Sequence, residues 1–284
     1  MTEIKWHKGT ESHMQIKENK GVVWLSYPAF EKFPDIVQAF STRLGGVSQG
    51  IYSSMNLSFT RGDDDAAVHE NYRRFAAAVG FEAEDIVTSD QTHTANVRVI
   101  TEEDRGNGIT KSRQYTDVDG MITNVPGLVL ATFYADCVPL YFVDPVHHAI
   151  GLSHSGWRGT VAKIGAVTVE RMREEYGTDP GDIYSAIGPS ICQDCYEVSE
   201  DVIQEFRNAF GRKDWDVLFY RKENGKYQLN LWEANRIIMQ EAGIREEHIS
   251  MPGICTCCNP EFLFSHRASH GKRGNLGAFL GIRK

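Results

Sequence analysis

Apolar residues recur along the chain with two periods, which predict short strands interleaved with helices. Strand-forming runs separated by turn residues occur at 22–27, 37–42, 97–100, 183–187, 262–265 and 277–282. Residues 128–134 are almost wholly apolar, which predicts a central strand covered on both faces. Val68, Tyr72, Phe75 and Val79 recur at helical spacing between a cluster of aspartates and Gly80, which predicts a helix over 65–79. The same reasoning predicts helices at about 161–176, 199–210 and 232–243.

Strands outnumber helices, and only some of the connections between them are helical, so we expect mixed sheets in an α/β (α+β) fold. Residues 21–284 show no repeat and no low-complexity linker, which favours one domain. Residues 1–20 are polar throughout and are predicted to be a disordered segment outside that domain.

One predicted hairpin brings together two side chains that bind metals. Residues 135–144 and 147–154 read as strands on either side of a turn at Pro145. If Asp144 and His147 close that turn, Cys137 lies directly opposite His154, at a separation that lets both bind one ion. Pro145 suits turn types I and II better than the usual hairpin turns, so a slipped or bulged register is the alternative.

His93 is the best candidate for a third ligand, because it lies in a polar segment just before the strand at 97–100. One thiolate and two imidazoles suit zinc, and three protein ligands leave a fourth position for water, as in catalytic zinc sites. The plainer alternative makes Cys137 a buried apolar residue and the two histidines ordinary surface residues.

The other five cysteines form a competing metal site. Cys192 and Cys195 make a CxxC pair, and Cys255, Cys257 and Cys258 follow some sixty residues later. A structural Cys₄ zinc centre is one interpretation. The CxCC arrangement departs from the usual spacing, which favours packed or redox-active thiols instead. The absence of a signal peptide in this sequence favours reduced thiols and a cytoplasmic location.

Charge and hydropathy narrow the class of partner. The net charge is −8, which argues against nucleic acid as a partner, because a phosphate backbone needs a basic face. No apolar run approaches the roughly 18 residues of a membrane span.

Three arginines, Arg43, Arg158 and Arg267, stand beside glycines or at element ends and could bind a phosphate. Each could equally be a solvated charge. Asp119 and Asp136 are candidates to orient a ligand histidine.

These segments together resemble the laccase-domain family, also described as multicopper polyphenol oxidoreductase-like proteins. The resemblance covers nearly all of residues 38–284. It includes the motifs at 41–48, 56–58 and 62–64, Gln91-Thr-His93, Asp119-Gly120, Ala135-Asp-Cys137-Val-Pro, His154-Ser-Gly-Trp-Arg-Gly159, and those at 187–189, 195–198 and 264–267. The chain departs from the family where Ala268 follows Arg267 in place of a second arginine.

The resemblance implies a mixed α/β sandwich, zinc bound by His93, Cys137 and His154, and phosphorolysis of adenosine, inosine, guanosine and methylthioadenosine. It further implies deamination of adenosine as a second activity. Alternatives are a hydrolase that edits peptidoglycan precursors, a copper-dependent polyphenol oxidase, and a non-enzymatic sensor or scaffold in which zinc has four protein ligands. Copper is the less favoured metal, because one Cys/His₂ site lacks the several coppers that phenol oxidation would need.

Overall fold

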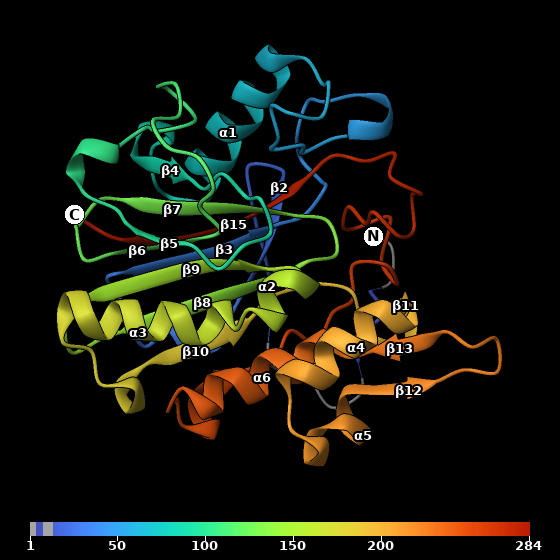
Figure 1. Ribbon diagram of the computed structural model, residues 1–284. Helices are drawn as coiled ribbons and strands as arrows, with labels where there is room; N and C mark the ends of the chain where they lie inside the picture. The colour runs from blue at the N-terminus through green and yellow to red at the C-terminus, as the bar shows by residue number, and fades with distance from the viewer. Residues whose placement is uncertain (1–3, 8–13) are drawn as a thin grey trace.

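Two six-stranded mixed sheets packed face to face form the centre of the molecule (Figure 1). The computed structural model describes residues 4–7 and 14–284. The first sheet has the order β1–β2–β3–β15–β7–β4, in which only β4 and β7 pair in parallel. Its strands are β1 (Gln15–Asn19), β2 (Val22–Ser26), β3 (Ile36–Ser41), β4 (Ile86–Thr88), β7 (Val129–Tyr134) and β15 (Leu276–Ile282).

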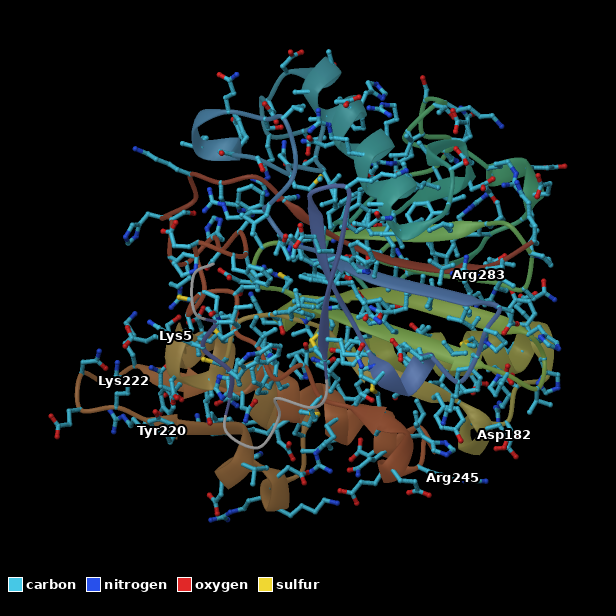
Figure 2. The ribbon with its side chains drawn as sticks, turned by 180° about the vertical axis from the view of Figure 1, so that it is seen from behind. Lys5, Asp182, Tyr220, Lys222, Arg245 and Arg283 are labelled. Carbon is cyan, nitrogen blue, oxygen red and sulfur yellow. The ribbon has the colours of Figure 1, made fainter. Side chains whose placement is uncertain are left out.

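The second sheet has the order β14–β10–β8–β9–β6–β5 and carries the predicted hairpin at its centre. Its strands are β5 (Val97–Val99), β6 (Gly120–Thr123), β8 (Val138–Asp144), β9 (Ala149–Ser155), β10 (Tyr184–Ile187) and β14 (Ile249–Ser250). A small third sheet joins β11 (Glu197–Val198), β13 (Tyr227–Leu229) and β12 (Phe219–Arg221). Figure 2 shows Tyr220 and Lys222 on the β12–β13 hairpin, which projects from the body of the molecule.

Helices cover the outer faces of both large sheets, so the fold has four layers (Figure 1). Helix α1 (Asp65–Val79) packs on the first sheet, where Phe75 stacks on Phe279. Helices α3 (Ile164–Tyr176) and α6 (Leu231–Glu241) pack on the second sheet. Between the sheets lies an apolar core that includes Phe40, Leu130 and Leu152. The remaining helices are α2 (Trp157–Val161), α4 (Glu200–Ala209), α5 (Trp215–Leu218) and 3₁₀ turns at Pro28–Phe30, Gly50–Tyr52, Ala83–Asp85, Glu102–Asp104, Pro180–Asp182, Gln193–Cys195, Arg212–Asp214 and Glu246–His248.

The structure confirms the predicted mixed α/β fold and most element positions. Helix α1 spans the predicted 65–79; the Asp64 side chain caps its N-terminus and Gly80 ends it in the left-handed conformation. The helix predicted at about 161–176 is α3, which begins at Ile164; a separate short helix, α2, precedes it, and Lys163 with φ +55° separates the two. Among the described residues, none of the helices combines the length and the apolar character that crossing a membrane requires.

Two predictions about the ends of the chain are wrong. Residues 262–265 are irregular, although their side chains are buried as the apolar pattern suggested. Residues 15–19, placed in a disordered segment, form β1 and pair with β2, and Met14 is buried in the core between the sheets. The segment 4–7 is also held, through hydrogen bonds between Lys5 and the Asn259 side chain. The rest of the predicted segment, 1–3 and 8–13, lies outside the described residues.

Candidate metal centre and cavity

The hairpin of β8 and β9 is formed as predicted, but its register differs. Asp144 pairs with Ala149 across a four-residue loop, and Pro139 lies opposite His154 where Cys137 was expected. The predicted register is therefore wrong by two residues, because the turn at Pro145 is longer than a two-residue turn. Side chains alternate with period two, so a shift of two residues leaves Cys137 and His154 facing the same side.

The structure brings the three predicted ligands together. Ligand atoms of His93, Cys137 and His154 all lie within 4.8 Å of one another, and the two imidazole rings meet edge to face with centroids 4.9 Å apart. Cys137 lies in the turn between β7 and β8, His154 near the end of β9, and His93 in the loop before β5. The donor set and its spacing fit a single ion with three protein ligands.

Asp119 orients both histidines. It was one of the two residues predicted for this role, with Asp136. Its side chain is fully buried, and its Oδ1 lies 2.7 Å from Nδ1 of His154, which leaves Nε2 of that ring for an ion. The same carboxylate accepts three backbone N–H bonds that fix the loop of His93, from Thr92 at 2.9 Å, His93 at 3.2 Å and Thr94 at 2.9 Å. Burial opposes the charge, but these bonds outweigh it and lower the pKa of Asp119 to about 2.

Charge in the centre already suits a cation. Burial favours the neutral thiol of Cys137, but the neighbouring His154 and His93 outweigh it and lower the pKa of Cys137 to about 6. Burial favours the neutral ring of His154, but the Cys137 thiolate and Asp119 raise the pKa of His154 to about 9. The thiolate is the form of cysteine that binds metals. A cation bound here would take the place of the imidazolium proton.

Gly156 leaves the space that the ligands occupy. A Cβ at this position would lie 2.9 Å from Cδ2 of His93 and 3.2 Å from Sγ of Cys137. Its φ of −72° is open to any residue, so the constraint is steric and not conformational.

We therefore expect Gly156→Ala to displace two candidate ligands and to weaken the binding of a metal ion by roughly 10-fold or more, as changes in residues that support metal ligands do. Gly211→Ala is the matched control, since its φ is −64° and its added Cβ would make only ordinary contacts. The measurement is competition for zinc with a chromophoric chelator. Equal affinity of both variants would show that Gly156 does not set the ligand geometry.

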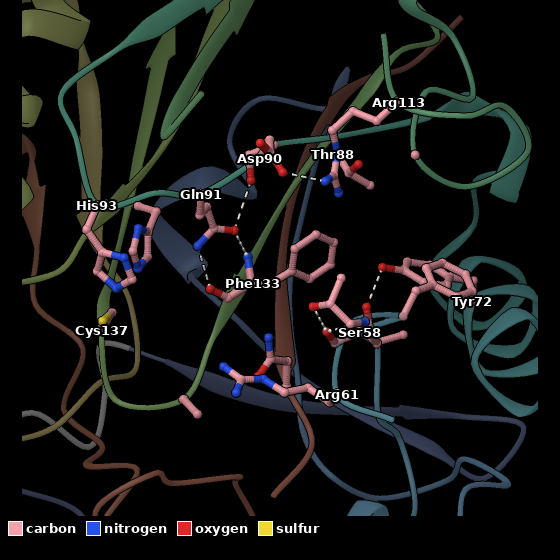
Figure 3. A pocket seen from close by; sticks show the side chains of 18 of the residues that line it. Ser58, Arg61, Tyr72, Thr88, Asp90, Gln91, His93, Arg113, Phe133 and Cys137 are labelled. Atoms are coloured by element: carbon pink, nitrogen blue, oxygen red, sulfur yellow. Dashed lines mark hydrogen bonds and ion pairs between the residues drawn. The ribbon is translucent and has the colours of Figure 1, made fainter. Parts of the chain in front are cut away.

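The metal centre opens into a cavity of about 210 Å³, many times the roughly 10–15 Å³ that one water needs. Figure 3 shows His93 and Cys137 on one side of it and the ring of Phe133 directed into it. The Gln91 side chain holds Phe133 in place, since its amide exchanges two hydrogen bonds with the backbone of that residue, at 2.7 and 2.8 Å. The cavity thus has a metal centre and an aromatic ring in its wall.

Three arginines that the sequence did not single out line this cavity: Arg61, Arg113 and Arg273. Arg113 is paired with Asp90 at 2.5 Å, whereas no salt bridge of the described residues includes Arg61. The Nε of Arg273 is buried without a hydrogen-bond partner. Burial, together with the charge of Arg61, lowers the pKa of Arg273 to about 10. Because both arginines line the cavity and one has an unused donor, they favour an anion as a ligand of this cavity.

The three arginines predicted to bind substrate lie elsewhere, and none lines the cavity. Arg43 donates to the carbonyls of Ser53 and Pro260 and stacks over Phe264. Arg267 donates to the carbonyls of Cys195 and Glu197. Arg158 is exposed and lies over the ring of Trp157. Contact of these three with substrate stays a prediction.

Comparison with known proteins gives a consistent result over most of the chain. Residues 37–283 match the family model described as multi-copper polyphenol oxidoreductase laccase. The chain is 37% identical to purine nucleoside phosphorylase YlmD of Bacillus subtilis over 88% of this chain and 90% of that protein. It is 35% identical to adenosine deaminase RL5, from an unknown prokaryotic organism, over 84% of this chain and 91% of that protein.

A solved structure shares the fold. The crystal structure of YlmD from Geobacillus stearothermophilus superposes with a TM-score of 0.88 at 36% identity, covering 96% of this chain and all of that one. The family match, these identities and the shared fold agree with the motifs that surround His93, Cys137 and His154. The chain belongs to the multi-copper polyphenol oxidoreductase (laccase-like) family.

Proposed function

We propose that this protein is a zinc-dependent purine nucleoside phosphorylase that also deaminates adenosine. The observation that carries the proposal is the opening of a three-ligand centre, His93, Cys137 and His154, into a cavity lined by arginines and an aromatic ring. Relatives that match most of the chain are a purine nucleoside phosphorylase and an adenosine deaminase, which supports the same two reactions here. Adenosine, inosine, guanosine and methylthioadenosine are the proposed nucleosides.

The ligands of the centre favour zinc. One thiolate and two imidazoles are borderline-soft donors, and three of them leave a coordination position free for a ligand from the cavity. Zinc bound there would supply a Lewis acid beside the substrate. Asp119 and the loop of His93 hold the donors in place beforehand, so that little reorganisation is needed when the ion binds.

Other residues of the cavity fit the parts of a nucleoside and phosphate. The partly exposed ring of Phe133 offers a face on which a purine can stack. Arg61 and Arg273 are placed to hold the phosphate, because guanidinium groups donate paired hydrogen bonds to its oxygens. The wall of the same cavity also contains the polar side chains of Ser58 and Asn275. Positioning and charge stabilisation are what a phosphate-dependent transfer asks of a protein.

In the proposed phosphorolysis, a phosphate oxygen forms a bond to C1′ of the ribose as the bond from C1′ to the purine nitrogen breaks. The electron pair of that bond goes to the purine, which takes up a proton and leaves as the free base, with ribose 1-phosphate as the second product. In the deamination, the oxygen of water adds to C6 of adenosine and ammonia leaves, giving inosine. The arginines serve only the first reaction.

Product analysis tests the proposal. Purified protein of measured zinc content, incubated with adenosine and phosphate, should release adenine and ribose 1-phosphate together. Without phosphate it should form inosine alone. Consumption of adenosine that never yields ribose 1-phosphate would rule out phosphorolysis, and failure to form inosine would rule out the second activity.

We expect Arg61→Ala to raise the KM for phosphate by roughly 10-fold or more, since a charge-assisted hydrogen bond contributes about 1.5–3 kcal/mol. Deamination should change little, because it uses no phosphate. Arg158→Ala provides the comparison, as Arg158 was predicted to bind substrate but is exposed outside the cavity. If Arg158→Ala alters the KM for phosphate and Arg61→Ala does not, the anion lies on the other side of the metal centre.

A copper-dependent polyphenol oxidase is one alternative, and the donor sets weigh against it. In residues 4–7 and 14–284, two groups of side chains can hold a metal, the Cys/His₂ centre and a group of four cysteines. Neither is the histidine-rich, multinuclear arrangement that several coppers would need. A hydrolase of peptidoglycan precursors stays a second alternative, which the product analysis above would reveal as inactivity on nucleosides.

A further inference from the structure

Four cysteines converge outside the cavity, where two loops meet. Cys192 and Cys195 lie in the loop after β10, and Cys255 and Cys258 lie in the loop after β14. Their four sulfur atoms all lie within 4.8 Å of one another. Cys192 and Cys255 are buried, the other two are half-buried, and none of the four lines the cavity. This group is therefore separate from the Cys/His₂ centre.

The two loops contribute cysteines at the same spacing. Cys192 and Cys195 form a C-x₂-C pair, and so do Cys255 and Cys258 once Cys257 between them is set aside. Cys257 is not part of the group. As a single CxCC motif, Cys255, Cys257 and Cys258 favour packed or redox-active thiols, but that motif hides the second C-x₂-C pair. Two C-x₂-C pairs are the arrangement of structural zinc sites.

Distances between the sulfurs fit one bound ion better than disulfides. Sγ of Cys195 and Sγ of Cys258 are 3.5 Å apart. Tetrahedral ligands with bonds of about 2.3 Å to zinc are separated by about 3.8 Å, whereas the sulfurs of a disulfide are about 2.05 Å apart. All four cysteines are free thiols. We propose that Cys192, Cys195, Cys255 and Cys258 hold a second zinc ion in a closed, structural Cys₄ site.

Backbone hydrogen bonds arrange the two loops around this site. The N–H of Cys192 points at Sγ of Cys255, 3.2 Å away, a contact that neutralises part of the charge of a thiolate ligand. A turn closes the first pair through the N–H of Cys195 and the carbonyl of Cys192, at 3.2 Å. The loops are joined directly by the N–H of Thr256 and the carbonyl of Ser190, at 3.1 Å. The four sulfurs are thus positioned before any ion binds.

Asp136 connects the cysteine group to the catalytic centre, because it directly precedes Cys137. Its carbonyl accepts from the N–H of Ile191 at 3.0 Å, next to Cys192. Its carboxylate accepts from the hydroxyl of Thr256 at 2.6 Å, between Cys255 and Cys258. Both loops therefore hold Asp136 in its unusual conformation, with φ of +89°. A zinc ion that joins the loops would fix the turn that presents Cys137 to its own metal.

Metal counting and cobalt spectroscopy on the full-length protein test the proposal. Zinc analysis of wild-type protein should give two ions per chain, one for each group. After exchange for Co²⁺, Cys258→Ser should lose most of the sulfur-to-cobalt absorption, since that group supplies four of the five thiolate ligands. Cys257→Ser, the matched control, should keep two ions and the full absorption. Cys137→Ala should keep the Cys₄ signal and lose one ion.

Several outcomes would overturn the proposal. One zinc per wild-type chain, iron in place of the second zinc, or disulfides among these four cysteines in protein purified under reducing conditions would each do so. An unchanged sulfur-to-cobalt absorption band in Cys258→Ser would also overturn the proposal. If Cys258→Ser does not fold, alkylation of the native wild-type protein decides. The four thiols should be protected until a chelator is added, whereas immediate modification of all of them would contradict a bound ion.

Discussion

Cys137→Ala is expected to remove the catalytic metal and abolish both proposed activities. In the proposed centre Cys137 supplies one of three ligands, so zinc affinity should fall by more than the roughly 100-fold that changes in residues behind the ligands produce. The measurement is zinc content and turnover of the same preparation, with Cys257→Ala as the control because Cys257 belongs to neither metal group.

The same variant separates two roles for the sulfur. A thiolate committed to a metal is a poor nucleophile, whereas a catalytic cysteine beside His154 would resemble a Cys–His hydrolase. If the sulfur is a ligand, the zinc ion of this centre and turnover are lost together. If Cys137→Ala keeps the full complement of zinc and loses only turnover, Cys137 acts as the nucleophile and the proposed mechanism is wrong.

Asp119→Asn should weaken zinc binding by roughly 10- to 100-fold, as is usual when the partner of a ligand histidine is changed. Replacing the carboxylate by the amide of asparagine removes one hydrogen-bond acceptor and adds a donor. In the wild type, Nδ1 of His154 and the N–H groups of the His93 loop all donate to Asp119. The NH₂ group of the amide must therefore face one of these donors. A buried donor facing a donor leaves both without a partner.

Asp117→Asn is a suitable control for this variant. Asp117 lies two residues away and accepts hydrogen bonds from the side chains of Thr94 and Asn96, but it is exposed and does not touch His154. It should bind zinc nearly as well as the wild type. Equal losses in both variants would mean that the loop as a whole is sensitive, and that Asp119 has no special role in orienting the ligands.

Local patterns predicted much of the fold, and they failed where the structure depends on contacts between distant segments. The apolar pattern located α1 through its helical period and β7 through its almost unbroken apolar run, because both bury side chains in the core. It missed β1, whose residues are mostly exposed and which is held by pairing with β2. It also predicted a strand at 262–265, which is wrong because a buried irregular loop has the same run of apolar residues as a buried strand.

The candidate site, like the fold, was predicted where local patterns suffice and missed where distant segments meet. The three candidate ligands lie together, as predicted, despite a wrong hairpin register, because an error of two residues does not change the face on which a side chain lies. Arg61 and Arg273 were missed, although each directly precedes a glycine, because they meet only when loops far apart in the chain fold together. Arg267 was selected for its motif, yet its guanidinium holds backbone carbonyls. Sequence position alone does not distinguish these roles.

The most direct test of the central claim is turnover of metal-free protein. Protein stripped by a chelator, and shown by elemental analysis to lack zinc, is assayed with adenosine and phosphate before and after zinc is added back. We expect no release of ribose 1-phosphate without the metal and recovery on adding zinc. Full turnover in the metal-free protein would contradict a catalytic role for the centre formed by His93, Cys137 and His154.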